Sequence, residues 1–400
     1  MMCLDCVELL LVALIVKTRK WMRLVAFTIL IFASLIQTAI ADIKCNATRP
    51  ASWMNSIPLS KDDWVAKRIG GSGQASQAYG LNNNGIVVGV YLATSFWRGG
   101  ASFHGFATGK DAEGFVDLGT LGNGDLNSSW AYSANDRGEV VGRSSNNEGK
   151  SYNGSMHAFI AKPPYKELFN LGRQAELSDS NANGISNSGL IVGSFKNSNN
   201  NYHAFIFNLN NLTVQKISPL SNDGNISAMA VNEQGLVVGY VAASKAQGGA
   251  TKPFVLKPDD ESIKLLKIPG RGGIPHAVNG RGQIAGGYYI EQTGEEHAFI
   301  TDADGVKFRD LGTLGGNYSR ALAVNSVGMV VGGSRPYGDI GCPSHAFVTG
   351  PNGIGLTDIN ALISLDFGHY FVDAVGINDK GEIVANASNG YAYLLKSFAK

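Results

Sequence analysis

A stretch of the form Asn-x-x-Gly-x-Val-Val-Gly recurs along most of this 400-residue chain and constrains its fold more than any other feature. Three residues before each first glycine stands an asparagine, replaced once by Ser186. Because asparagine bonds to its own turn and glycine accepts a positive φ, Asn-x-x-Gly between apolar runs predicts a hairpin turn. The first glycines, spaced 46 to 53 residues apart, mark seven copies: Gly85, Gly138, Gly189, Gly235, Gly282, Gly328 and Gly381.

Two further signals divide the copies into four short strands; the first follows every turn, and the second occurs in the first six copies. The first is centred on His-Ala-Phe and is degenerate in the fourth and seventh copies; it stands at His104, His157, His203, Lys252, His297, His345 and Tyr391. The second has the form Asp-Leu-Gly-Thr-Leu-Gly, as at residues 117–122 and 310–316, with weaker versions in four other copies. In the sixth copy the predicted strands A to D cover residues 321–325, 329–333, 345–349 and 354–358.

Four strands in about 49 residues, repeated seven times, predict an all-β fold. We expect a seven-bladed β-propeller of four-stranded antiparallel blades. The seventh copy ends at its third strand, whereas residues 64–71 precede the first copy and resemble a fourth strand. We therefore expect this N-terminal strand to pair in the last blade and close the ring, which leaves no blade with an open edge.

Small residues occupy the positions four and two before the turn asparagine in nearly every strand A, as at Ala78 and Gly80. Seven inner strands that converge on an axis have little room, so we interpret these residues as a response to crowding there. The 51 glycines of the chain have the same origin in part, because many recur in the turns and strands of the repeat.

The N-terminus reads as an export signal. Residues 24–36 are apolar and uncharged, follow four basic residues, and precede Ala39-Ile40-Ala41, after which we expect cleavage. We predict a signal peptide over residues 1–41, of which 1–21 would be an upstream start artefact if Met22 is the true start. A tether over 42–61 and one propeller over 62–398 follow. The mature chain would be secreted or periplasmic, without membrane insertion.

Charge and cysteine content limit the other options. Lys and Arg total 33 against 32 Asp and Glu, which gives no electrostatic reason to expect nucleic acid as a partner. The mature chain keeps only Cys45 and Cys342, which an oxidising compartment would allow to pair. We expect a monomer.

The combination of Asp-Leu-Gly-Thr-Leu-Gly-Gly, Asn-x-x-Gly-x-Val-Val-Gly and His-Ala-Phe resembles the HAF-repeat family of bacterial extracellular repeat proteins. Residues 310–347 are the nearest match, and the resemblance covers about residues 64–395. It implies an exported bacterial protein of repeat architecture, and it implies no particular activity.

The connections from strand B to C and from D to A lie on one face of such a ring, vary in length and hold unusual residues. Exposed aromatic side chains beside arginine can stack on sugars or anchor a protein partner. The candidate ligand-binding residues on this face are Phe96, Trp97, Arg98, Trp130, Tyr152, Tyr202, Tyr288, Arg335, Tyr337, Asp339, His369 and Tyr370.

Metal and catalytic signals are weak. The recurrent histidines occupy equivalent places on different blades, so a ring would separate them, and we expect a structural hydrogen-bonding role. His276 and His369 lie outside that register. No cofactor is predicted, although calcium would suit the acidic turns that hold Asp223, Asp259, Asp260, Asp302 and Asp304. The usual hydrolase, phosphate-loop and zinc motifs do not occur.

These observations favour an exported binding module that recognises a protein or glycan through its B–C and D–A loops, without catalysis. One alternative is an extracellular carbohydrate-active hydrolase or lyase, with Arg98, Arg335, Asp339 and His369 meeting at the ring mouth. Another is a structural protein of the cell envelope.

Overall fold

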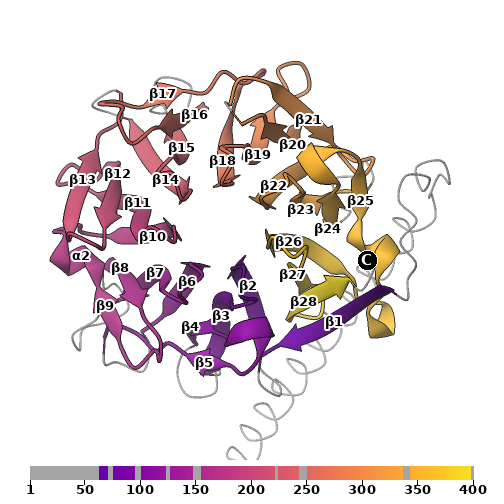
Figure 1. Cartoon of the computed structure of the whole chain (residues 1–400), viewed down its shortest axis with the longest axis horizontal. Helices are drawn as coiled ribbons and strands as arrows, with labels where there is room; N and C mark the ends of the chain where they lie inside the picture. Colours follow the sequence, from indigo (N-terminus) through magenta and orange to yellow (C-terminus); the bar gives the residue numbers. More distant parts are fainter. Residues whose placement is uncertain are drawn as a thin grey trace, which may run out of the picture. The chain divides into compact units, whose positions relative to one another are not determined.

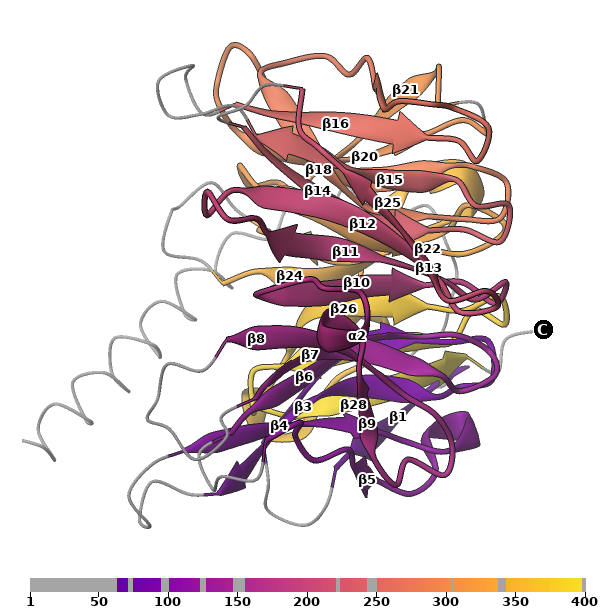
Figure 2. The ribbon, with the colours of Figure 1, turned by 90° about the vertical axis from the view of Figure 1, so that its left-hand side faces the viewer.

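Seven four-stranded antiparallel sheets stand around a common axis and contain nearly all of the regular secondary structure in the described part of the chain (Figure 1). The structure, a computed structural model, describes residues 63–70, 75–94, 101–122, 127–146, 155–220, 224–242, 250–303, 305–336 and 343–397. The predicted seven-bladed propeller is therefore confirmed. Figure 2 shows the strands running from one face of the ring to the other.

The described residues form 28 strands, and the blades follow one another in chain order. Blade 1 has β2 (Ser76–Leu81), β3 (Val87–Thr94), β4 (Ser102–Ala107) and β5 (Val116–Asp117). Blade 2 has β6 (Ser129–Ala134), β7 (Val140–Ser145), β8 (Met156–Ala161) and β9 (Leu168–Asn170). Blade 3 has β10 (Ser180–Ile185), β11 (Leu190–Lys196), β12 (Tyr202–Asn208) and β13 (Thr213–Ile217). Blade 4 has β14 (Asn225–Val231), β15 (Val237–Ala242), β16 (Thr251–Leu256) and β17 (Lys264–Leu265).

The last three blades follow the same order, except that the outermost strand of blade 7 comes from the start of the propeller. Blade 5 has β18 (Gly272–Val278), β19 (Ile284–Tyr289), β20 (Glu296–Thr301) and β21 (Phe308–Gly312). Blade 6 has β22 (Ser319–Val324), β23 (Val330–Ser334), β24 (His345–Thr349) and β25 (Leu356–Asp358). Blade 7 has β26 (Phe371–Ile377), β27 (Ile383–Ala387), β28 (Ala392–Ser397) and β1 (Trp64–Ile69). Short helices are α2 (Leu171–Gln174), α3 (Ile359–Leu362), η4 (Lys110–Ala112), η6 (Pro351–Gly353) and η7 (Asp366–Gly368).

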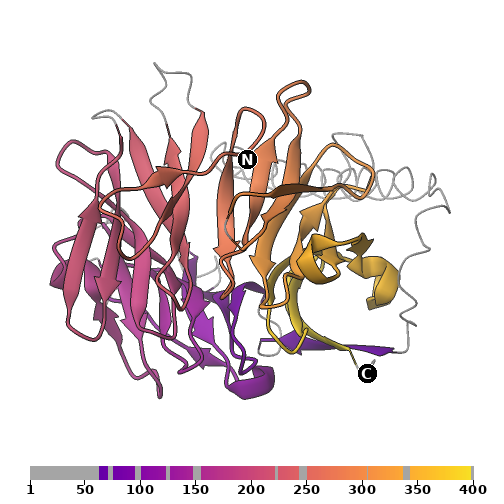
Figure 3. The same cartoon turned by 45° about the horizontal axis from the view of Figure 1, so that its top comes forward.

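The N-terminal strand closes the ring as predicted. β1 pairs antiparallel with β28 along its whole length, from Trp64 opposite Ser397 to Ile69 opposite Ala392. Figure 3 shows β1, in indigo, along the yellow strands of blade 7. The two ends of the propeller thus share one sheet, and β28 is not left with unpaired backbone groups.

Each Asn-x-x-Gly sequence forms the turn between strands A and B, as expected. In blade 1, Oδ1 of Asn82 accepts hydrogen bonds from the backbone N–H groups of Asn84 (3.0 Å) and Ile86 (2.9 Å). The glycine of the turn has φ between +74° and +86° in all seven copies, a conformation that other residues rarely adopt.

The turn asparagines also link the blades, a role that sequence reasoning did not foresee. Nδ2 of Asn82 donates to the carbonyl oxygen of Asn135 in the next blade at 2.7 Å. Equivalent bonds begin at Asn135, Asn232, Asn279, Asn325 and Asn378. Ser186 has no amide to donate and interrupts the relay between blades 3 and 4.

A glycine and an aromatic ring face each other in the core of each of the first six blades. Gly89 of β3 lies opposite Phe106 of β4, and a Cβ on Gly89 would meet the Phe106 ring at 2.8 Å and the Gln77 carbonyl at 2.0 Å. The six phenylalanines at this place are fully buried, and each contributes roughly 1.5–3 kcal/mol through burial. In blade 7 the pair is Ala385 and Tyr393. The packing therefore explains both the second glycine of the repeat and the phenylalanine of His-Ala-Phe.

The small residues of strand A face a neighbouring blade, which agrees with our interpretation that converging inner strands have little room. A Cβ on Gly80 would meet the backbone carbonyl of Tyr132 in the next blade at 2.9 Å. Close contact between adjacent inner strands therefore requires small residues at these positions. The side chains that face the axis are larger.

Candidate functional site

The inner strands present two positions on one face, which we count back from the Asn or Ser that opens each A–B turn. The side chains at position −3 line a central channel with a cavity of about 320 Å³. One residue comes from each blade: Tyr79, Tyr132, Asn183, Met229, His276, Leu322 and Val375. The channel is therefore walled by aromatic, amide and apolar groups with a single histidine.

Position −5 lies nearer the face that carries the B–C and D–A connections, which we call the mouth face. Its occupants differ in every blade: Gln77, Trp130, Asn181, Ser227, Ile274, Arg320 and Asp373. Each lies opposite a residue of strand B, so that the two side chains share one face of the sheet. Positions −3 and −5 both vary, whereas position −4 between them is alanine in every blade except blade 5, which has Pro275.

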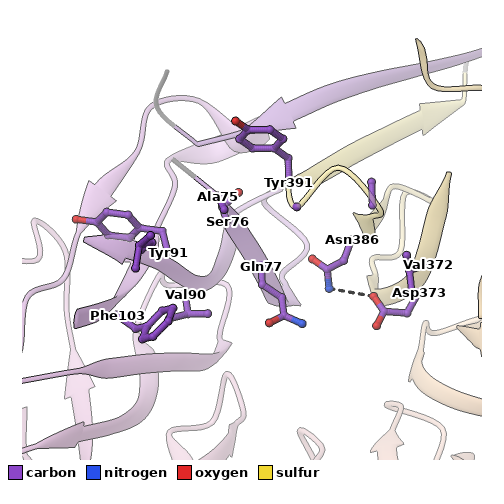
Figure 4. A pocket seen from close by; sticks show the side chains of 13 residues that line it. Ala75, Ser76, Gln77, Val90, Tyr91, Phe103, Val372, Asp373, Asn386 and Tyr391 are labelled. Carbon is purple, nitrogen blue, oxygen red and sulfur yellow. Dashed lines mark hydrogen bonds between the residues drawn. The ribbon is translucent and has the colours of Figure 1, made fainter. Parts of the chain in front are cut away.

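A pocket of about 420 Å³ opens at the seam between blades 7 and 1, where the ring closes (Figure 4). β26 and β27 contribute Asp373 and Asn386, and β2 contributes Gln77. Aromatic walls come from Tyr91, Phe103 and Tyr391. Phe103 is 39% exposed, and its ring is accessible from solvent.

Asn386 holds this seam together. Its Oδ1 accepts the backbone N–H of Ala78 at 2.8 Å, and its Nδ2 donates to the Ala78 carbonyl at 3.2 Å. The same Nδ2 donates to Oδ1 of Asp373 at 2.9 Å. The amide therefore joins blade 7 to the inner strand of blade 1 and orients the carboxylate of Asp373.

Asp373 is half-buried, and burial raises its pKa above the ordinary range of a carboxyl group, although the hydrogen bonds from Asn386 act in the opposite direction. None of the described residues forms an ion pair with it. A carboxyl group whose pKa is shifted by burial is often found in functional sites.

An equivalent pocket of about 470 Å³ opens at the seam between blades 3 and 4. Its polar lining is made of amides and hydroxyls, including Asn181, Ser194 and Tyr240. It shares Asn181, Asn183 and Met229 with the central channel, so the two cavities are adjacent.

Large side chains occupy the same level at other blades. In blade 2 the Arg143 guanidinium lies over the ring of Trp130, at 4.8 Å from its centroid, and 5.9 Å from that of Tyr132. Between blades 5 and 6, Arg320 binds Glu296 at 2.6 and 2.7 Å, and the Glu296 carboxylate lies where a Cβ on Gly287 would be. Large or ion-paired side chains therefore fill this level in blade 2 and between blades 5 and 6.

The five recurrent histidines are hydrogen-bonded within their own blades, which confirms the structural role predicted for them. Three pair with the aspartate that begins the Asp-Leu-Gly signal, as in His345 Nδ1 to Asp358 Oδ2 at 2.8 Å. His157 and His203 bond to serines instead. Burial alone would raise the pKa of Asp117, but hydrogen bonds from His104 and from the Gly119 amide hold it below its ordinary value.

His276 is the one described histidine in the channel wall. Its Nε2 is buried and has no hydrogen-bond partner among the described residues. Burial, and then the positive charge of Arg320, lower the pKa of His276 to about 4. The ring is therefore neutral at physiological pH.

The structure describes six of the predicted ligand-binding residues and distributes them around the ring. Trp130 lies under Arg143, Tyr202 lines the pocket between blades 3 and 4, and Arg335 lies over Tyr318 at 5.3 Å. Tyr370 packs on His345. His369 lines a separate pocket along β1, with Trp64 and Phe367, on the outer side of blade 7. Arg335 and His369 thus have different surroundings, and Arg98 and Asp339, expected beside them at the ring mouth, lie outside the described residues.

Tyr288 is buried, and its hydroxyl donates to Oδ2 of Asp310 at 3.1 Å. Burial, and then Asp310, raise the pKa of Tyr288 to about 12. The remaining predictions lie outside the described residues: Phe96, Trp97, Arg98, Tyr152, Tyr337, Asp339, Cys45, Cys342 and the signal peptide over 1–41.

Acidic turns were the predicted calcium sites, and three of their residues are described. Oδ1 of Asp302 accepts hydrogen bonds from the amides of Val306 and Lys307, which is a turn role, and Asp260 pairs with Lys264. Asp259 is exposed, whereas Asp223 and Asp304 lie outside the described ranges. Within those ranges, no three His, Cys, Asp or Glu side chains come together as a metal site would require.

Solved structures of very different sequence share the fold. An oligogalacturonate lyase from Vibrio parahaemolyticus has a TM-score of 0.53 at 8% identity, over 84% of this chain and 94% of that one. A prolyl endopeptidase has a TM-score of 0.54 at 10% identity, over 82% and 50%. An acylaminoacyl peptidase from Pyrococcus horikoshii has a TM-score of 0.52 at 9% identity, over 86% and 54%. The chain thus spans about half the length of each peptidase, and the likeness is one of fold.

No family model and no curated protein matches the sequence, so membership of the HAF-repeat family stays a prediction. None of the helices in the described ranges is both long and apolar enough to cross a membrane.

Sequence reasoning missed Gln77, Asp373, Asn386 and Tyr391, because it searched the loops and the pocket is walled mainly by strands. A signal was present in the repeat. Position −5 differs in every blade, and only blade 7 replaces the strand B glycine with alanine and follows it with asparagine.

Proposed function

We propose that this protein is an exported binding module that holds a protein or glycan ligand at the mouth face of its propeller, without catalysing a reaction. The observation that carries the proposal is the pocket between blades 7 and 1. It combines three aromatic walls with hydrogen-bonding groups from Gln77, Asp373 and Asn386. Concave sites with mostly apolar walls and a few convergent polar groups are typical of ligand binding.

The lining of the cavities favours binding over glycoside chemistry. Hydrolysis of a glycosidic bond usually needs two carboxyl groups that flank the bond. Among the described residues that line the channel and the two seam pockets, Asp373 is the one carboxylate. Apart from Asp373, the functional groups of the lining are mostly amides and aromatic rings. These groups recognise sugars and peptides without reacting.

Export is supported by the sequence alone. The apolar segment of residues 24–36 and the Ala39-Ile40-Ala41 sequence would direct the chain to the periplasm or the medium. A binding module there would meet glycans and proteins of the cell surface.

A glycan array and a pull-down with the purified chain test the proposal, with Phe103→Ala as the decisive variant. Phe103 lines the pocket and is 39% exposed, so truncation should leave the fold intact and weaken a true ligand about tenfold or more. Phe169→Ala is the matched control, because Phe169 is 51% exposed on the outer strand β9.

A ligand that binds both variants as tightly as it binds the natural chain does not use this pocket. If no glycan or protein binds Phe103→Ala more weakly than it binds the natural chain, the proposal is overturned. A purified ligand that is chemically converted on incubation would show an enzyme instead.

A further inference from the structure

We propose that the pocket between blades 7 and 1 selects ligands that carry a primary ammonium group, which binds the carboxylate of Asp373 among aromatic walls. This inference rests on the proposed binding function and names the chemistry of its ligand.

Asp373 is the single formal charge among the described residues that line the pocket. One oxygen accepts the Nδ2 of Asn386 at 2.9 Å, and no lysine, arginine or histidine of the described chain reaches the carboxylate. Removing a carboxylate from water without a counter-charge is costly. A ligand cation would remove that cost, and a neutral ligand would not.

The contrast with blade 6 supports this assignment. Arg320 holds the same position −5, and its guanidinium is bound by both oxygens of Glu296. The two charged residues at position −5 therefore differ. Arg320 has an ion-pair partner within the protein, whereas Asp373 has none among the described residues.

The walls of the pocket suit a cation as well. Tyr91, Phe103 and Tyr391 line it, and the faces of aromatic rings attract ammonium groups. The ring of Tyr391 already carries one cation, since the Arg68 guanidinium lies 4.8 Å from its centroid. Arg68 does not line the pocket and makes no ion pair with Asp373.

Hydrogen-bonding groups beside Asp373 would fix the orientation of the amine. An ammonium group has three donors, and the carboxylate of Asp373 can accept one or two of them. The side chain of Gln77 projects into the same pocket from blade 1, on the other side of the seam (Figure 4). Its amide oxygen accepts the hydroxyl of Tyr79 at 3.2 Å and retains a second lone pair.

A primary ammonium group could belong to the lysine side chain of a protein or to an amino sugar of a glycan. Calorimetric titration of the full chain at pH 7 with Nα-acetyl-lysine amide and with glucosamine separates the two sources. Nα-acetyl-norleucine amide and glucose are the matching neutral probes. We expect one amine to bind about tenfold or more tightly than its neutral counterpart.

Asp373→Asn keeps an oxygen that can accept the Nδ2 of Asn386, and we expect it to abolish this preference. Because the substitution removes a half-buried charge, its melting temperature should equal or exceed that of the natural chain, which a purely structural role would not allow. Asp259→Asn removes an equal charge from an exposed turn of blade 4 and should change nothing.

Equal binding of amine and neutral probe, or an unchanged preference in Asp373→Asn, overturns the inference, as does failure of both amines to bind. The proposed binding function would still stand after these results if a neutral ligand from the array binds the natural chain but not Phe103→Ala. It fails with them if no ligand depends on Phe103.

Discussion

Nδ2 of Asn378 donates a hydrogen bond to the carbonyl oxygen of Asn82 at 3.3 Å, across 296 residues of sequence. This bond joins the last A–B turn to the first, and with the other turn asparagines it links every pair of neighbouring blades except blades 3 and 4. It lies in the same pair of blades as the tie between Asn386 and Ala78. The ring is thus closed at three levels: the outer strand β1, the seam amide and the turn relay.

The gap in the relay at Ser186 gives the first prediction. Ser186→Asn would supply an amide that donates to the carbonyl oxygen of Asn232 and an oxygen that accepts turn amides, as in the other blades. We expect the free energy of unfolding to rise by about 1 kcal/mol, measured by urea denaturation. Ser262→Asn, at an exposed site without a side-chain hydrogen bond in the described structure, is the control. A variant no more stable than the control would show that the relay does not stabilise the ring.

Strand B glycines should tolerate no side chain. Gly89→Ala places a Cβ 2.0 Å from the Gln77 carbonyl and 2.8 Å from the Phe106 ring, so we expect a loss of about 3 kcal/mol or more, or failure to fold. Gly280→Ala is the control, because nothing lies within 4 Å of a Cβ there. Thermal melting compares the two. Similar melting temperatures would contradict the packing of glycine against phenylalanine.

The neutral His276 should make stability depend on pH. Its pKa is about 4 in the folded chain and ordinarily about 6.5, so the unfolded chain binds the proton first as pH falls. Neutral His276 therefore makes its full contribution to the free energy of unfolding above about pH 6.5. This contribution is lost progressively as the pH falls to about 4, by about 3 kcal/mol in total.

His276→Gln should therefore flatten the fall in unfolding free energy between pH 6.5 and 4, measured by urea denaturation at several pH values. His369→Gln, at an exposed position, is the control and should keep the slope. An unchanged slope in His276→Gln would show that the histidine is protonated as readily in the folded chain as in the unfolded one.

Removal of β1 should expose an edge. A chain that begins at residue 71 leaves β28 with unpaired backbone groups, and we expect lower thermal stability and association into dimers or aggregates. Light scattering after size-exclusion chromatography measures the mass. A stable monomer of unchanged melting temperature would mean that the turn relay and Asn386 suffice to close the ring.

The sequence predicted the architecture well because the repeat encodes it locally. Each Asn-x-x-Gly turn and each apolar strand could be identified by itself, and the missing fourth strand of the last copy pointed to residues 64–71. The blade-to-blade bonds of Asn82 and its equivalents could not be foreseen, because turn geometry alone already explained asparagine there.

The site was harder to predict for a physical reason. Aromatic residues near loops were taken as exposed, yet Tyr288 is buried against Phe299 and Phe308, and Trp130 is covered by Arg143. The pocket combines Gln77 of one blade with Asp373 and Asn386 of the next, and such a combination appears only when equivalent positions of different blades are set side by side.

A map of amide chemical shifts on titration with Nα-acetyl-lysine amide or glucosamine would show whether the seam between blades 7 and 1 binds a ligand. We expect shifts concentrated on β2, β3, β26 and β27 around Gln77 and Asp373, and their loss in Asp373→Asn. Shifts centred on the pocket between blades 3 and 4 or along β1, or no shifts with either probe, would contradict it.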